Sequence, residues 1–196
     1  MSHYYSATQE SPFVPKKVHA LISGKDYTFF SGAGVFSKDA VDYGTKLLAE
    51  HMQIGKNDRV LDLGCGIGVL GRVAAEKTKN DVVLVDVNAR AVALARMNTK
   101  GMKQVKVLQS DGYAAVAEEK FDVILLNPPQ TAGKKICFAL IEGAKEHLHS
   151  RGSLQVVARH NKGGETLSKH MAEVFGNIET LVKRGGYRVY ISIEEV

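Results

Sequence analysis

The sequence predicts an α/β fold: a Rossmann-like, mostly parallel sheet with an antiparallel last strand, extended by a small N-terminal hairpin and helix. Three observations indicate this class. Apolar runs typical of buried strands alternate with segments of helical spacing from Asp58 onward. A glycine-rich turn follows the first of these runs. The chain closes with two β-prone runs joined by Lys183-Arg184-Gly185-Gly186, a connection too short for a parallel crossover.

The N-terminal extension is predicted from turn signals. Residues 1–16 are polar and aromatic, and we expect an extended arm there. Two β-prone runs, 18–22 and 27–30, flank a glycine-containing turn and predict a hairpin. A glycine-rich loop over 31–37 then leads to a helix expected over 39–52.

The elements of the sheet follow in chain order. Strands are expected over 60–63, 81–86, 105–108, 121–126 and 154–158, with 178–182 and 187–193 as the closing hairpin. Helices are expected after the glycine turn, after Asn88, between Ile136 and Leu148, and between Leu167 and Phe175. Asn88 is a favourable N-cap, and Gly101 marks the end of the helix that it starts. The apolar run over 121–126 is typical of a central parallel strand.

Length and composition fit one globular domain with a small extension. The chain has 196 residues, of which 44% are hydrophobic and 24% charged. No apolar run reaches the length of a membrane span, and the first residues lack the core of a signal peptide, so we expect a cytoplasmic protein. The net charge of +5 permits an anionic partner. The two cysteines lack metal-ligand spacing, so we expect no metal site.

The glycine turn Asp62-Leu63-Gly64-Cys65-Gly66-Ile67-Gly68 organises the chain. Glycine permits positive φ and close approach of a ligand to the backbone, and the N–H groups at a helix start attract anionic groups. Two registers compete. The span 66–71 fits the dinucleotide fingerprint, with Asp86 as the acid about twenty residues further on. The pattern acid-x-Gly-x-Gly-x-Gly closely resembles the cofactor turn of class I S-adenosylmethionine (SAM) methyltransferases.

Four polar clusters follow strands at the same edge of the predicted sheet. In an open parallel sheet the ligand lies beyond the carboxyl ends of the strands, so we expect the clusters to converge. Asp86 is placed to accept hydrogen bonds from both ribose hydroxyls. Asp111 either accepts from an adenine amine or is a turn residue. Asp62 either braces the glycine turn or contacts the cofactor through water. The clusters are 62–68, 86–88, 110–112 and 127–129.

Asn127-Pro128-Pro129 discriminates between the two registers. Two prolines after a buried strand stiffen the backbone and remove two N–H donors. The Asn127 side-chain carbonyl and nearby main-chain carbonyls remain as acceptors, which suits a planar –NH2 group. Accepting its hydrogens frees the nitrogen lone pair for attack on the sulfonium methyl of SAM, so alignment and electrostatics suffice without a strong base. A simple strand-ending turn is the alternative interpretation.

Together these motifs resemble the "methyltransferase small" (MTS) domain of the small-subunit rRNA guanine-N2 methyltransferases and of their single-domain prokaryotic relatives. The resemblance covers most of the chain. It rests on His3-Tyr4-Tyr5-Ser6, Gly34-Val35-Phe36-Ser37, Asp42, Gly44 and Thr45, the SAM turn, Asn127-Pro128-Pro129 and Gly185-Gly186-Tyr187-Arg188.

The resemblance implies a SAM-dependent N-methyltransferase acting on an exocyclic amine of RNA, guanine N2 of small-subunit rRNA. It implies an arm, hairpin and cofactor-covering loop over 1–37 and a methyltransferase domain over 38–196. The catalytic residues would be Asn127, Pro128 and Pro129. The cofactor residues would be Phe36, Asp62, Gly64, Cys65, Gly66, Gly68, Asp86, Val87, Asp111, Gly112 and Asn127.

One departure leaves the substrate open. Related enzymes carry an aromatic residue after the prolines that stacks on a flipped base, and this chain has Gln130. A protein-glutamine or DNA adenine methyltransferase is the alternative within this chemistry, because those families also use Asn-Pro-Pro. An NAD-dependent oxidoreductase and a non-catalytic SAM-fold RNA-binding module are alternatives of a different class.

Two basic clusters are predicted beside the target amine. Lys134 and Lys135 follow the prolines, and Arg159, His160 and Lys162 follow the fifth strand. We expect Lys134, Lys135, Arg159 and Lys162 to contact RNA phosphates, which predicts strongly salt-dependent binding. Ordinary solvated charge is the competing interpretation.

Overall fold

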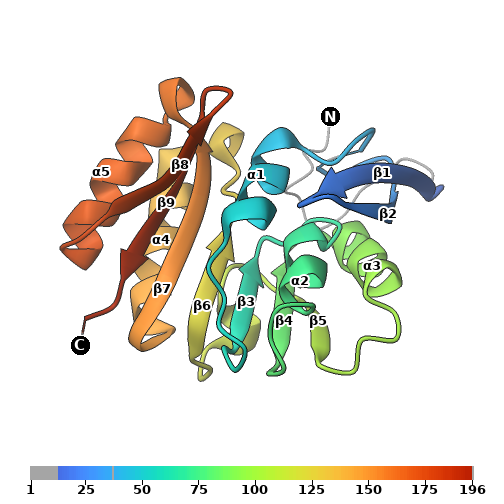
Figure 1. The fold of residues 1–196 in the computed structure, drawn as a ribbon, viewed down its shortest axis with the longest axis horizontal. Helices are drawn as coiled ribbons and strands as arrows, with labels where there is room; N and C mark the ends of the chain where they lie inside the picture. Colours follow the sequence, from blue (N-terminus) through green and yellow to red (C-terminus); the bar gives the residue numbers. More distant parts are fainter. Residues whose placement is uncertain (1–12, 37, 196) are drawn as a thin grey trace.

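The computed structural model describes residues 13–36 and 38–195 (Figure 1). Most of the expected N-terminal arm, including His3, Tyr4 and Tyr5, lies outside these residues. In the described part, seven strands form one sheet of order β5-β4-β3-β6-β7-β9-β8, with β5 at the right of Figure 1. The strands are β3 (Val60–Leu63), β4 (Val82–Asp86), β5 (Val105–Gln109), β6 (Phe121–Leu126), β7 (Leu148–Arg159), β8 (Glu179–Arg184) and β9 (Tyr187–Ile193).

The sheet has the predicted topology. Strands β5, β4, β3, β6 and β7 are parallel, and β9 runs antiparallel to both β7 and β8. The antiparallel last strand is therefore confirmed. Gly185 and Gly186 both have positive φ, 58° and 77°, which gives β8 and β9 the tight turn that the two glycines predict.

Helices cover both faces of the sheet. They are α1 (Tyr43–His51), α2 (Val69–Ala74), α3 (Ala89–Asn98), α4 (Lys134–Glu146) and α5 (Gly164–Phe175). Alternate residues of the strands divide between two cores: Val82 and Leu84 join the core of α1, α2 and α3, while Val83 and Val85 join that of α4 and α5. This explains the continuous apolar runs, because a strand buried on both faces needs apolar residues throughout. No helix within 13–36 and 38–195 is long and apolar enough to cross a bilayer.

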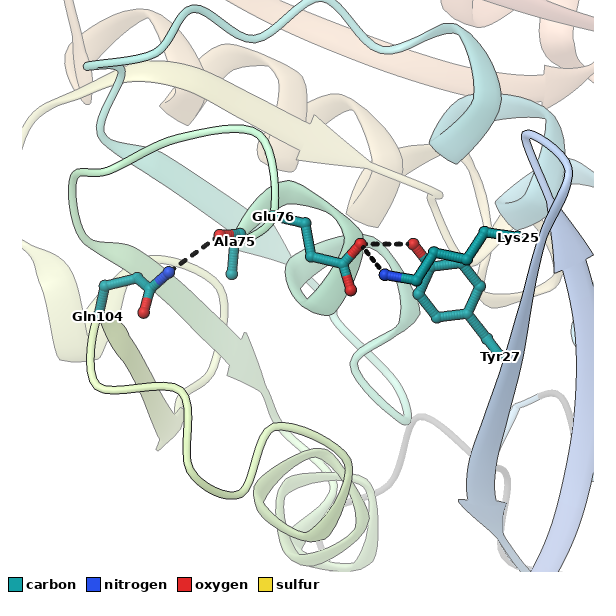
Figure 2. Close-up of polar contacts among 5 residues, drawn as sticks. All are labelled: Lys25, Tyr27, Ala75, Glu76 and Gln104. Atoms are coloured by element: carbon teal, nitrogen blue, oxygen red, sulfur yellow. Dashed lines mark hydrogen bonds and ion pairs between the residues drawn. The ribbon is translucent and has the colours of Figure 1, made fainter.

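The N-terminal hairpin is part of the first core. Its strands are β1 (Lys16–Ile22) and β2 (Lys25–Ser31), and Phe29 is buried with the residues of α1 and α2. Figure 2 shows Lys25 and Tyr27 reaching Glu76 beyond the end of α2, both at 2.7 Å from its Oε2. On the other side of that segment, the Gln104 amide donates to the Ala75 carbonyl at 2.9 Å (Figure 2). These bonds fix the hairpin beside the sheet.

Two element boundaries differ from the prediction. Helix α1 begins at Tyr43 and not at residue 39, because Asp42 is its N-cap and accepts the N–H of Thr45 at 2.8 Å. Strand β7 extends back to Leu148, beyond the expected start at 154. After the buried Leu148, residues 149–151 are polar and exposed, where the register against β6 shifts, so they lack the apolar run by which a buried strand is predicted.

Candidate active site

A cavity of about 320 Å³ lies at the carboxyl edge of β3, β4, β5 and β6. The four polar clusters converge there, as predicted, because parallel strands end on the same side. All but one of the predicted cofactor residues line the cavity: Phe36, Asp62, Gly64, Cys65, Gly66, Asp86, Val87, Asp111, Gly112 and Asn127. Pro128 and Pro129 line it as well.

The glycine turn presents bare backbone to the cavity. Gly64 and Gly66 have φ of 68° and 54°, and a Cβ added at either would meet no protein atom within 4 Å. Gly68 is the exception among the predicted cofactor residues. It lies outside the cavity lining, and a Cβ there would approach Ala95 and Leu84 to 3.1 Å. The third glycine therefore permits the close packing of the start of α2 against β4 and α3.

Asp86 ends β4 and shapes the turn. Its Oδ2 accepts the N–H of Gly66 and its Oδ1 accepts the N–H of Asn88, each at 2.8 Å. Burial raises the pKa of the Asp86 carboxyl above its usual range. A carboxylate has about four lone-pair sites, so each oxygen keeps capacity for a further donor. Because Asp86 also lines the cavity, it can accept hydroxyl donors from a bound molecule.

Asp62 braces the start of α2 from below. It is buried, and its Oδ2 accepts the N–H of Gly71 at 2.8 Å. Burial, together with the nearby charge of Asp86, raises the pKa of Asp62 to about 7. Burial likewise raises the pKa of the neighbouring Cys65 thiol, so Cys65 has no character of a nucleophilic thiolate.

Asn127 is held in one orientation by the first turn of α1. Its Nδ2 donates to Asp42 Oδ2 at 3.0 Å and to Thr45 Oγ1 at 2.8 Å. The same Asp42 oxygen also accepts from Thr45 Oγ1 at 3.1 Å. With both hydrogens of the amide in use, the remaining polar atom of the Asn127 side chain is its carbonyl oxygen. The residue lines the cavity, so the site offers a fixed acceptor there.

The contact between Asn127 and Asp42 joins residues 85 positions apart. Sequence reasoning identified Asp42 and Thr45 only as part of a family resemblance. The spacing Asp42-x-x-Thr45 is a usable signal for a helix N-cap, but it says nothing of the distant amide. The orientation of the Asn127 amide therefore could not be predicted from the residues near it in the sequence.

Gln130 ties the proline loop to the end of β7. Its Nε2 donates to the Lys162 carbonyl at 3.1 Å, and its Oε1 accepts the N–H of Arg159 at 3.2 Å. The predicted RNA residues Arg159 and Lys162 thus lie beside the proline loop, in and around the short 3₁₀ turn η3 (His160–Lys162). Lys134 and Lys135 are exposed on the first turn of α4, after the 3₁₀ turn η2 (Gln130–Ala132).

Apolar side chains form the remaining walls. Phe36 lines the cavity from the loop after β2, and Ile136 and Leu140 line it from α4. The loop is fastened by the Nδ2 of Asn88, which donates to the Gly34 carbonyl at 2.7 Å. The cavity therefore combines flat apolar walls with carboxylates and bare backbone, a donor and acceptor set that fits a nucleoside carrying an amino-acid tail.

The family model for the methyltransferase small domain matches residues 26–191. The chain belongs to this family. The MTS protein is 36% identical over 195 residues to the uncharacterized protein YbxB of Bacillus subtilis, which covers 95% of this chain and 96% of YbxB. It is 35% identical over 173 residues to ribosomal RNA small subunit methyltransferase C of Haemophilus influenzae, covering 85% of this chain and 51% of the relative. The MTS protein thus spans about half the length of the ribosomal methyltransferases it matches.

Solved structures agree. The 16S rRNA N2 methyltransferase RsmC of T. thermophilus, in complex with AdoMet and guanosine, superposes with a TM-score of 0.81 at 27% identity. The match covers 94% of the MTS protein and 52% of that chain. A methyltransferase from Pyrococcus furiosus, at 21% identity and a TM-score of 0.65, supports the fold alone and covers 78% of this chain and 82% of its own.

These findings confirm the class I methyltransferase fold and the SAM-dependent activity. They set aside the oxidoreductase and the non-catalytic module. The cofactor is SAM, which carries an electrophilic methyl group on a sulfonium. The cavity fits it, because Gly64 and Gly66 present bare backbone and Asp86 presents a carboxylate to the cavity. The roles of individual residues stay predictions: Asp86 toward the ribose, Asp111 toward the adenine amine and Phe36 over the cofactor.

Proposed function

We propose that the MTS protein transfers a methyl group from SAM to an exocyclic amine of RNA, and that this amine is guanine N2 of small-subunit rRNA. The observation that carries the proposal is the Asn127 amide, whose NH2 group is held by Asp42 and Thr45 while the residue lines the cavity. The Asn127 carbonyl oxygen, fixed in this way, can accept a hydrogen bond from a bound substrate. A planar exocyclic NH2 group is such a donor.

The residues of the site act by alignment. Asn127 Oδ1 accepts a hydrogen of the target amine and so directs the nitrogen lone pair away from itself, toward the methyl group. Pro128 and Pro129 keep the backbone stiff, which preserves that direction. The nitrogen–carbon bond forms as the carbon–sulfur bond breaks, and the nitrogen then releases one proton to water. No buried base is needed, since the attacking amine is neutral and the leaving sulfur loses its charge.

Two further observations support RNA as the substrate. Relatives at 33 to 36% identity are named ribosomal RNA small subunit methyltransferase C, and the T. thermophilus structure contains guanosine. Lys134, Lys135, Arg159 and Lys162 are exposed around the proline loop, where phosphates of a bound strand would pass. An rRNA substrate would place the reaction in the cytoplasm, with the small ribosomal subunit or its RNA as partner.

The test is transfer of labelled methyl groups from SAM to total RNA of a strain that lacks the gene. Small-subunit rRNA should take up label, and nucleoside mapping should find N2-methylguanosine. Asn127→Ala should lower the rate by about 100-fold or more, because it removes the only oriented acceptor of the proposed mechanism. Urea unfolding of the variant controls for loss of the fold.

The protein-glutamine and DNA adenine alternatives share the Asn-Pro-Pro chemistry. The same labelled SAM is therefore offered to DNA and to a total protein extract from that strain. Label in either fraction with none in RNA would overturn the proposed substrate while preserving the amine chemistry.

A further inference from the structure

The proline loop lacks the aromatic residue that would stack on a target base. Gln130 occupies that position. Its amide nitrogen donates to the Lys162 carbonyl, and its amide oxygen accepts the N–H of Arg159. A base withdrawn from its neighbours needs a new stacking surface to offset the loss. A ring elsewhere near Asn127 would supply that surface.

Two tyrosines contact each other next to the Asp42–Asn127 hydrogen bond. Tyr43 begins α1, directly after the Asp42 that holds Asn127, and Tyr187 begins β9. Their ring centroids are 5.5 Å apart at an interplanar angle of 52°. Tyr43 is 43% exposed, so part of its ring is open to solvent.

Two glycines make room for this pair. A Cβ at Gly44 would lie 3.0 Å from the Tyr187 ring, and a Cβ at Gly185 would lie 2.9 Å from the Tyr43 ring. Both rings are therefore seated against bare backbone. This placement limits their rotation and lets them keep one orientation without burying the outer face of Tyr43.

The contacts around the pair form a closed series. Asn127 bonds to Asp42, Tyr43 packs on the β8–β9 turn, and the carbonyl of Gly186 in that turn accepts the N–H of His160 at 2.9 Å. The η3 segment then returns to the proline loop through Gln130. We name these four segments the target frame; they are 42–45, 127–130, 159–162 and 183–187.

The target frame carries unpaired positive charge. Arg159, Lys162, Lys183 and Arg184 are exposed. Within the described residues, no carboxylate lies within ion-pair distance of any of these four side chains. Lys183 and Arg184 are the last two residues of β8, directly before the β8–β9 turn, whose Gly185 lies against Tyr43.

We propose that the target frame binds a single-stranded RNA segment: Tyr43, backed by Tyr187, stacks on a base, and Lys183 and Arg184 contact the flanking phosphates. This rests on the proposed RNA substrate and adds residues that the proline loop and the two basic clusters do not include. A ring beside a row of cations is the arrangement that single-strand binding uses, because each base has a face to stack and each link carries a charge.

The test measures binding without turnover. Fluorescence anisotropy reports the affinity for a labelled twelve-nucleotide purine-rich RNA, with S-adenosylhomocysteine present. Tyr43→Ala should weaken binding about tenfold, and Tyr43→Phe should leave it unchanged, because stacking needs the ring and not the hydroxyl. Lys183→Gln with Arg184→Gln should reduce the slope of log affinity against log salt by about 1.4, two phosphates on a single strand.

Lys77→Gln with Lys79→Gln is the matched control, because it removes the same charge beyond α2, at the amino edge of β4. It should leave the slope unchanged. Thermal unfolding and S-adenosylhomocysteine affinity show that each variant is folded. Unchanged RNA affinity in both Tyr43→Ala and the Lys183/Arg184 variant would overturn the target frame. A wild-type protein that binds RNA through these residues but methylates none would instead overturn the proposed function.

Discussion

Replacing Asp42 separates a structural role from a positioning role. Its Oδ2 accepts from the Thr45 N–H, the Thr45 hydroxyl and the Asn127 amide at 2.8, 3.1 and 3.0 Å. The first of these bonds caps α1, and an N-cap contributes about 1 kcal/mol to stability. The bond to Asn127 is charge-assisted, and such bonds contribute about 1.5–3 kcal/mol.

The two contributions predict different effects. Asp42→Ala removes both interactions, so it should lower the free energy of unfolding by roughly 2.5–4 kcal/mol, about 1 from the cap and about 1.5–3 from the bond to Asn127. It should also release the Asn127 amide to rotate, so that its NH2 group faces the target amine for part of the time. A loss of about 1.5–3 kcal/mol of orientation corresponds to a fall in kcat of about 10- to 100-fold. SAM affinity should be unchanged, because Asp42 does not line the cavity.

A second variant, Asp42→Asn, separates the helix cap from the charge-assisted bond to Asn127. Asparagine caps helices as well as aspartate does, so the contribution of the cap, about 1 kcal/mol, should return. The carboxylate is still absent, so kcat should stay below wild type by about tenfold. The assays are urea unfolding and single-turnover methyl transfer with saturating SAM. A kcat that recovers fully in Asp42→Asn, or that never falls in Asp42→Ala, would show that Asp42 only caps the helix.

Three further outcomes follow from the site. Gly64→Ala should weaken SAM binding by at least about tenfold in calorimetry, because Gly64 lines the cavity and a side chain at φ 68° strains this turn by about 1 kcal/mol. Gly101→Ala, at φ 89° in a surface turn, carries the same strain and should leave SAM binding intact. Gly71→Ala should destabilise the fold by about 1–3 kcal/mol in urea, since its Cβ would lie 2.5 Å from Leu84; a neutral result would mean that α2 shifts freely. Asp62 has a folded-state pKa of about 7, above its unfolded value, so its contribution favours folding at low pH and is lost as pH rises toward 7. Wild-type stability should therefore fall relative to Asp62→Asn between about pH 4 and pH 7, by at most about 1.4 kcal/mol per pH unit, and parallel curves for the two proteins would contradict the raised pKa.

Much of this site follows from local sequence pattern. Leu125 and its neighbours in β6 are apolar on both faces, so the central strand and its direction were predictable. Because parallel strands end together, Asp86 and Asn127 could be placed at one edge without coordinates. The glycine pattern also predicted the cofactor turn, and Gly64 and Gly66 take the positive φ that glycine permits.

What local pattern missed depends on contacts between distant segments. The two amide hydrogens of Asn127 are bound by a helix cap from a different part of the chain. The glycine at position 68 fits the cofactor pattern, yet its environment is Ala95 and Leu84, which only the packed structure reveals. Gln130 looked like a missing base contact in the sequence, and the fold shows it as the link to η3.

The order of the sheet also bears on how the protein is made. Strand β9 lies between β7 and β8, although it is synthesised after both. Until β9 leaves the ribosome, β7 has an open edge of unpaired N–H and C=O groups, and β8 has no partner. Strand β8 joins the sheet only through β9, so the open edge of the sheet moves from β7 to β8 when the last strand pairs.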